Sequence, residues 1–446
     1  MRDILVTLIV LGSLPYIFKR PYIGVLMWVW LSVMNPHTQG WGFATTFPFA
    51  AIVAGVTLLS LLFTREPKNL PLTPVTWVLI AFVFWMNVTT VFAFHPELVY
   101  DQWNKVMKIM LMILVTFMLI KTKHHVQLLV LVVTASLAYY GVKGGIFTLQ
   151  TRGEHRVWGP GNSFIGGNNE IALALIITIP LLHYFQIIVR NKWVRHGLTA
   201  AMLLCAVAAL GTHSRGALLA IAAMSGFLWL KSRQKFRLGL LMMLAIPPML
   251  AFMPAEWTER MDTINNYEED GSVQGRFNAW GMAYNLATDR PIGGGFVVDT
   301  RELFDRYAPD ITDIPRAAHS IYFQALGEHG FVGLGLYLIL GLLTWRTGTW
   351  IVRNTKNLEE YKWAFALATM IQVSLIGFAT GGAFLSLLYF DAPYYLMAAM
   401  VATRVLLEKE LREKVSSGVV KKGYSSQRQS GQLNPSPSQP IAKDSG

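Results

Sequence analysis

Long apolar runs alternate with short polar interruptions over most of this chain. From Ile4 to Leu407 the runs are close to the ~20 residues that an α-helix needs to cross ~30 Å of hydrocarbon. Candidate spans lie near residues 47–63, 74–93, 105–120, 126–140, 168–189, 197–211, 217–230, 237–254, 319–344, 361–379 and 383–406. The pattern predicts an all-α, polytopic membrane domain over residues 1–413. A disordered cytoplasmic tail, rich in Ser, Gln, Pro and Lys, is expected over 414–446.

The first 34 residues leave the number of spans open. Residues 4–18 and 22–34 are short apolar runs separated by Lys19, Arg20 and Pro21. They form either one broken span or a pair of short ones, so the total is 12 or 13.

Basic residues mark alternate connections and therefore predict the orientation of the chain. Connections that carry several lysines or arginines are expected in the cytoplasm. The remaining connections are 35–46, 94–104, 141–167, 211–216, 255–318 and 380–382, and they are expected outside. An even number of spans places both termini in the cytoplasm.

Composition agrees with a membrane protein and argues against nucleic-acid binding. The chain is 53% hydrophobic and 14% charged, which is too apolar for an ordinary soluble domain. Although the net charge is +12, the connection 255–318 holds twelve acidic residues, six arginines and no lysine. The positive excess lies in the predicted cytoplasmic connections and tail, where topology and anionic lipid explain it. The single Cys205 excludes an intramolecular disulfide and a cysteine-based metal site.

The long connection 255–318 has the sequence of an ordered structure. Phe277, Trp280 and Tyr284 follow helical spacing over residues 274–286, which predicts an amphipathic helix lying in the membrane interface. The glycine-rich stretch 290–295 is expected to end it as a turn rather than to hold a phosphate, because no strand precedes the glycines.

His319 opens a long apolar run and is therefore expected near the outer membrane boundary. An imidazole with a pKa of ~6.5 is mostly the free base at neutral pH and can accept a proton from a hydroxyl. The alternative is an interfacial histidine that caps the helix.

Three arginines on the predicted outer side could bind an anion. Arg215 lies between two apolar runs and runs against the positive-inside bias; it either binds an anion or extends to the interface. Arg276 begins the predicted interfacial helix, with a local salt bridge to the acidic run 268–270 as the alternative. Arg156 lies in the connection 141–167. The planar guanidinium suits phosphate and pyrophosphate because it donates two parallel hydrogen bonds.

Glu328 and His329 lie about nine residues into the helix that follows His319, roughly 13 Å deeper. An ionisable pair at that depth is either functional or an internal bridge between closely packed helices. The chain has no motif typical of a metal, nucleotide or serine-nucleophile site.

Three short blocks in order resemble the O-antigen ligase and polymerase superfamily. They are Ser214-Arg215-Gly216; Gly275-Arg276 with Trp280 and the later Pro291-x-Gly293-x-Gly295; and the run from His319 to Gly333, with Glu328. The resemblance implies a twelve-span GT-C-like fold with a large periplasmic loop, in the bacterial inner membrane. The N-terminal third is similar to a subgroup described as O-glycosylation ligases.

The resemblance also implies an activity. A glycan preassembled on undecaprenyl pyrophosphate would be transferred to lipid A-core on the periplasmic face, without metal or cofactor and with inversion. From the chemistry of the residues themselves, we hypothesise that His319 is the general base and that Arg215 and Arg276, helped by Arg156, bind the pyrophosphate. An O-antigen polymerase and a protein O-glycosylation ligase are alternatives within the superfamily. A lipid or glycan transporter is the alternative from another class.

Overall fold

The computed structural model describes residues 1–231 and 271–416, and within these ranges the chain forms helices and no strands. The α-helices are α1 (Arg2–Lys19), α2 (Pro21–Val29), α3 (Phe49–Phe63), α4 (Pro74–Val91), α5 (Pro96–Leu119), α6 (Lys123–Gln150), α7 (Asn168–Ile188), α8 (Lys192–Gly211), α9 (Arg215–Lys231), α12 (Gly271–Asp289), α13 (Arg301–Tyr307), α14 (Ile321–Thr355), α15 (Lys362–Gly381) and α16 (Asp391–Ser416). The predicted span 237–254, the acidic run 268–270 and most of the predicted tail lie outside the described residues.

Seven helices of the described ranges are long and apolar enough to cross a membrane. They are α4 to α8, α14, and α15 with its flanking turns; α2 with the following turn, α3 and α9 are shorter apolar helices. The predicted all-α, multi-pass membrane architecture is therefore confirmed. The total of twelve spans and their orientation stay predictions.

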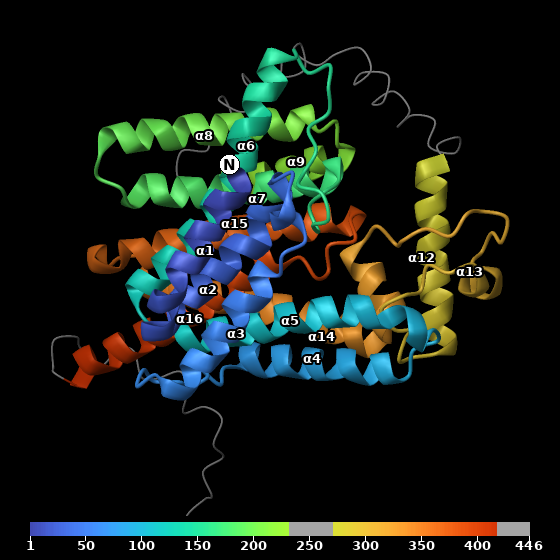
Figure 1. Cartoon of the computed structure of the whole chain (residues 1–446), viewed down its shortest axis with the longest axis horizontal. Coiled ribbons are helices and arrows are strands. Elements are labelled where there is room, and N and C mark those ends of the chain that lie inside the picture. Colours follow the sequence, from blue (N-terminus) through green and yellow to red (C-terminus); the bar gives the residue numbers. More distant parts are fainter. Residues whose placement is uncertain (232–270, 417–446) are drawn as a thin grey trace, which may run out of the picture.

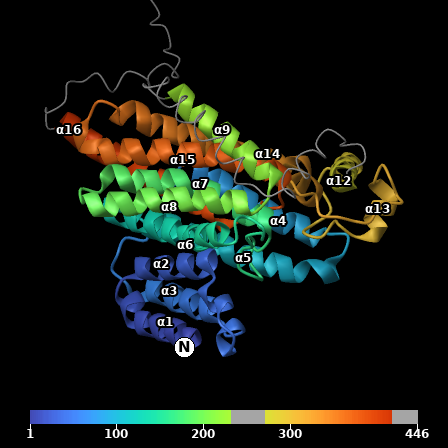
Figure 2. The ribbon, with the colours of Figure 1, turned by 90° about the horizontal axis from the view of Figure 1, so that it is seen from above.

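The N-terminal region forms two helices rather than one broken helix. The chain leaves helical geometry at Arg20 (φ −139°) and re-enters it at Pro21, which suits the first turn because that position needs no N–H donor. Helices α1, α2 and α3 pack against one another beside the rest of the bundle (Figure 2).

Helix α12 runs across one end of the bundle, whereas α4, α5, α7, α8 and α14 run roughly along a common direction (Figure 1). It includes the predicted interfacial helix 274–286 and ends at Asp289, just before Arg290-Pro291. We call this end of the bundle the site end. That α12 lies in a membrane interface remains a prediction.

Several predicted boundaries were wrong. Helix α6 continues to Gln150, so Lys143 and its neighbours in the predicted connection 141–167 are helical. The glycines of this segment allow close packing: Gly141 contacts Cys205 of α8, and Gly145 contacts the backbone of Leu204. Residues 385–390 form a loop rather than the start of the last span, and α16 begins at Asp391.

Helix α14 is broken at Gly330, whose φ of +67° is non-helical. The break frees carbonyl groups of the preceding turn, and two glycine N–H groups bind them. Gly294 donates to the oxygen of Gly327 at 2.8 Å, and Gly295 donates to that of Glu328 at 2.9 Å. The glycine-rich loop after α12 forms the predicted turn, in which the N–H of Gly293 donates to the carbonyl of Arg290 at 2.8 Å. It also ties the crosswise helix to the bundle, which was not predicted.

Candidate active site

His319 lies at the site end, in the last residues before α14, with its backbone fixed on both sides. Its N–H donates a 3.0 Å hydrogen bond to the hydroxyl of Ser386. The carbonyl of the preceding Ala318 accepts a 2.7 Å hydrogen bond from the indole of Trp280 on α12. The N-cap of α14 is Ser320, whose hydroxyl accepts from the N–H of Phe323. The helix-capping role that was the alternative for His319 therefore belongs to its neighbour.

The backbone of His319 is in the left-handed region, with φ +43°. Such a conformation is uncommon for a residue other than glycine, and holding it requires support from the surrounding structure. Here Ser386 and Trp280 supply that support from two distant parts of the chain. The imidazole therefore has a set position relative to α12 and the loop 385–390.

Burial and positive neighbours keep the His319 imidazole neutral. Desolvation lowers its pKa below 6.5, and the charges of Arg276 and Arg316 lower the pKa further, while Asp299 opposes them. The side chain is half-buried, so a substrate can still reach it. A neutral imidazole beside cations can accept a proton at a place where anionic groups are attracted.

Arg276 lies on α12, and its charge reaches two other parts of the site end. It acts electrostatically on His319 and on Glu170, which lies in the first turn of α7. Three separate segments are thereby brought together. For Arg276 and His319 the sequence predicted this, because their blocks lie on the same predicted membrane face. The predicted local partners of Arg276 at 268–270 lie outside the described residues.

Arg215 is the first residue of α9, at the same end of the bundle. The preceding turn is fixed by a 2.9 Å hydrogen bond between His213 and the carbonyl of Gly153. The next residue, Gly216, faces Phe384, whose ring centroid lies 6.4 Å from that of Trp280. These contacts link the start of α9 to the segment that holds His319.

Arg156 lies beside the turn that leads to Arg215. The N–H of Val157 donates to the carbonyl of Gly211 at 2.9 Å, and Asn168 donates from its amide to the carbonyl of Thr212 at 2.9 Å. The loop 151–167 is therefore packed on the end of α8. Arg156 and Arg215 are half-buried. The segments that carry the four predicted site residues are thus linked to one another, while the chemical roles of these residues stay predictions.

Sequence reasoning missed three charged residues of this region. Arg316 and Asp299 act electrostatically on His319, and Glu170 does so on Arg276. Arg316 lies three residues before His319, and this short separation could have suggested that its charge acts on the imidazole. Nothing in the sequence pattern pointed to Asp299, because its proximity to His319 depends on the fold.

The buried pair Glu328 and His329 belongs to a closed hydrogen-bond network. His329 shares hydrogen bonds with Thr89 at 2.7 Å and with the hydroxyl of Tyr389 at 2.6 Å. Tyr389 also donates to Glu328, which accepts a second hydrogen bond from Gln324 at 3.0 Å. These partners join α4, α14 and the loop 385–390, which agrees with an internal bridge. A functional role of the pair stays the alternative prediction.

Comparison with protein families matches two regions of the chain. Residues 200–338 match the family model described as O-Antigen ligase, so this region is similar to that family. Residues 1–189 match a family of unknown function, DUF5935. No curated protein matches the chain.

The region 200–338 contains three of the four predicted site residues, namely Arg215, Arg276 and His319. Arg156 and Glu170 come instead from the region that matches the family of unknown function. The site end therefore includes residues of both regions, which are linked through the turn 211–214 and through Arg276.

Proposed function

We propose that this protein transfers a preassembled glycan from undecaprenyl pyrophosphate to lipid A-core, on the periplasmic face of a bacterial inner membrane. The observation that carries the proposal is His319, a half-buried imidazole whose pKa is lowered by burial and by the charges of Arg276 and Arg316. It lies in the region 200–338, which matches the O-Antigen ligase family. The helical bundle supplies the membrane setting that two lipid-linked substrates require.

His319 is the general base in the proposed reaction. A hydroxyl of the acceptor sugar attacks the anomeric carbon of the donor from the face opposite the pyrophosphate. As the new carbon–oxygen bond forms, the bond to the pyrophosphate oxygen breaks and undecaprenyl pyrophosphate leaves with the electron pair. His319 Nδ1 or Nε2 accepts the hydroxyl proton and later releases it to solvent. The product has inverted configuration, and no covalent enzyme intermediate forms.

Arg215, Arg276 and Arg156 bind the pyrophosphate and stabilise the charge that develops on it. The donor is already activated, so positioning and electrostatics account for most of the required catalysis. No metal or nucleotide takes part in the proposal. The proposal includes a GT-C-like fold in which α12, the helix that crosses one end of the bundle (Figure 1), lies at the membrane boundary.

Reconstitution of the purified protein tests the proposal. Donor glycan on undecaprenyl pyrophosphate is supplied with lipid A-core in the presence of EDTA, and the products are separated by mass. We expect glycosylated lipid A-core from the wild type and none from His319→Ala. Transfer that depends on added divalent metal would contradict the mechanism.

Parallel reactions distinguish the alternatives. Transfer only to a second donor molecule identifies a polymerase, and transfer only to Ser or Thr of a peptide identifies a protein ligase. Movement of the glycan lipid across a proteoliposome without any transfer identifies a transporter and overturns the proposed reaction.

A further inference from the structure

An apolar groove of about 700 Å³ lies on the face formed by α6, α7 and α8. One stripe of α6 lines it, together with the last turn of α7 and the first turns of α8: Leu131, Thr134, Ala135, Ala138, Tyr139, Val142, Lys143, Ile146, Leu182, Phe185, Val189, Val194 and Leu198. Volumes of this size are typical of small-molecule sites.

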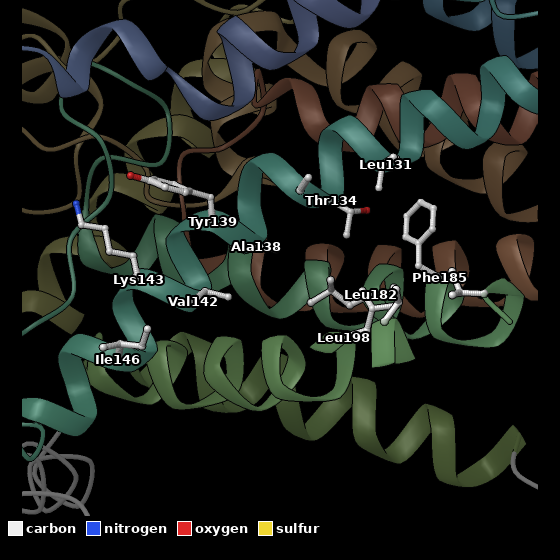
Figure 3. Close-up of a pocket in the computed structure, with 13 residues that line it drawn as sticks. Leu131, Thr134, Ala138, Tyr139, Val142, Lys143, Ile146, Leu182, Phe185 and Leu198 are labelled. Atoms are coloured by element: carbon white, nitrogen blue, oxygen red, sulfur yellow. The ribbon is translucent and has the colours of Figure 1, made fainter. Parts of the chain in front are cut away.

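The groove has one polar end. Figure 3 shows the hydroxyl of Tyr139 and the amine of Lys143 at one end of the row of lining side chains, whereas Leu131 and Phe185 lie at the other. Tyr139 donates a 3.0 Å hydrogen bond to Gln39, so its hydroxyl is already engaged. Lys143 is therefore the group at this end that can meet an anion.

Lys143 is exposed on a helix that is apolar and long enough to cross a membrane. No carboxylate within the described ranges forms an ion pair with it. An ammonium group on a lipid-facing surface is costly unless it reaches the interface or pairs with an anion. The groove beneath it continues for twelve residues of α6, from Lys143 to Leu131, or about 18 Å. That length is close to half of the ~30 Å hydrocarbon core, the depth of one leaflet.

We propose that this groove binds an anionic glycerophospholipid, with one acyl chain along the stripe of α6 and the phosphate on Lys143. The positive charge of Lys143 favours an anionic headgroup. The length of the groove matches an acyl chain that spans one leaflet. The site is independent of the transferase proposal, because its residues lie outside the predicted catalytic set.

Native mass spectrometry of the full-length protein in nanodiscs tests the site. The nanodiscs contain equal amounts of phosphatidylglycerol and phosphatidylethanolamine, and retained lipid is counted after gas-phase release. We expect phosphatidylglycerol to be retained preferentially by the wild type. Lys143→Ala should weaken its retention about fivefold, since a single lysine contributes on this scale to binding an anionic lipid surface.

Two further variants separate groove binding from general contact with lipid. Ala135 is exposed in the groove, so Ala135→Trp should fill it without disturbing the core and should reduce retention. Lys108→Ala, at an exposed lysine of α5 outside the groove, should change nothing. Equal retention of both lipids by the wild type, or unchanged retention in Lys143→Ala, would overturn the proposal. So would displacement of phosphatidylglycerol by an equimolar amount of undecaprenyl phosphate, which would assign the groove to an isoprenoid chain.

Discussion

The indole nitrogen of Trp280 lies 2.7 Å from the carbonyl oxygen of Ala318, so the crosswise helix directly holds the residue before His319. The same indole stacks on Phe323 with ring centroids 4.8 Å apart. Trp280 thus fixes the start of α14 from both sides of His319. The position of the imidazole depends on α12 as much as on its own helix.

Removing this hydrogen bond should reduce activity without unfolding the protein. In Trp280→Phe the stacking surface remains but the donor is lost, which leaves the Ala318 carbonyl unpaired. We expect kcat to fall about tenfold, because a small displacement of a catalytic group is costly. Thermal unfolding in detergent should shift by only a few degrees. Activity equal to the wild type would show that the position of His319 does not depend on α12.

Replacing the proposed base should have a larger effect. His319→Ala should lower kcat by about 10²–10⁴-fold, the usual contribution of a general base. His124→Ala, at an exposed histidine at the start of α6, is the matched control and should retain full activity. Steady-state transfer rates in proteoliposomes measure both.

The pH profile should report the electrostatics around His319. A base whose pKa is lowered stays unprotonated, and therefore active, below pH 6.5; activity is lost as the pH falls through the lowered pKa. Arg316→Gln removes a charge that lowers the pKa, so the acidic limb of kcat/KM should move to higher pH. Asp299→Asn removes a charge that raises the pKa, so the limb should move to lower pH. Shifts in the same direction for both variants would contradict this assignment.

The arginines should not be replaceable by lysine. Arg215→Lys keeps the charge but loses the planar pair of donors that matches a pyrophosphate. We expect kcat/KM to fall at least about tenfold, the equivalent of one charge-assisted hydrogen bond. Arg65→Lys, at an exposed arginine between α3 and α4, should be neutral. Near-full activity of Arg215→Lys would exclude a bidentate contact.

The break in α14 gives a prediction about stability. In Gly330→Ala the added methyl group would overlap the carbonyl of Pro291, and alanine would have to adopt φ +67°. We expect a loss of about 3 kcal/mol or more from strain and overlap together. Gly335→Ala, on the same helix with open space around it, is the control and should be neutral or slightly stabilising. Thermal unfolding in detergent compares the two, and equal midpoints would contradict the strain.

The sequence predicted most of the helices because their apolar runs are long and separated by charge. It failed where tertiary contacts determine the outcome. The span predicted to end near residue 140 continues to Gln150, and its glycines allow α8 to approach closely. The break at Gly330 was not predicted because it requires the loop 291–295, which lies far away in the sequence, to supply two N–H groups.

The candidate site was predicted in part for the same reason. Short motifs suggested Arg215, Arg276 and His319, and their order indicated one membrane face. The motifs do not show which residues hold the backbone around His319 in place. The hydrogen bond from Trp280 and the left-handed conformation of His319 therefore appeared only in the structure. Asp299 acts electrostatically on His319, and Glu170 interacts with Arg276. Both interactions join segments that are far apart in the sequence.

The docking of the glycine-rich loop on the break in α14 has an evolutionary consequence. Gly293 and Gly330 each have a positive φ, and a side chain on either would strike backbone of the opposing segment. Neither position can change alone without separating the two segments. Among descendants of this sequence, both glycines should therefore be inherited or lost as a pair.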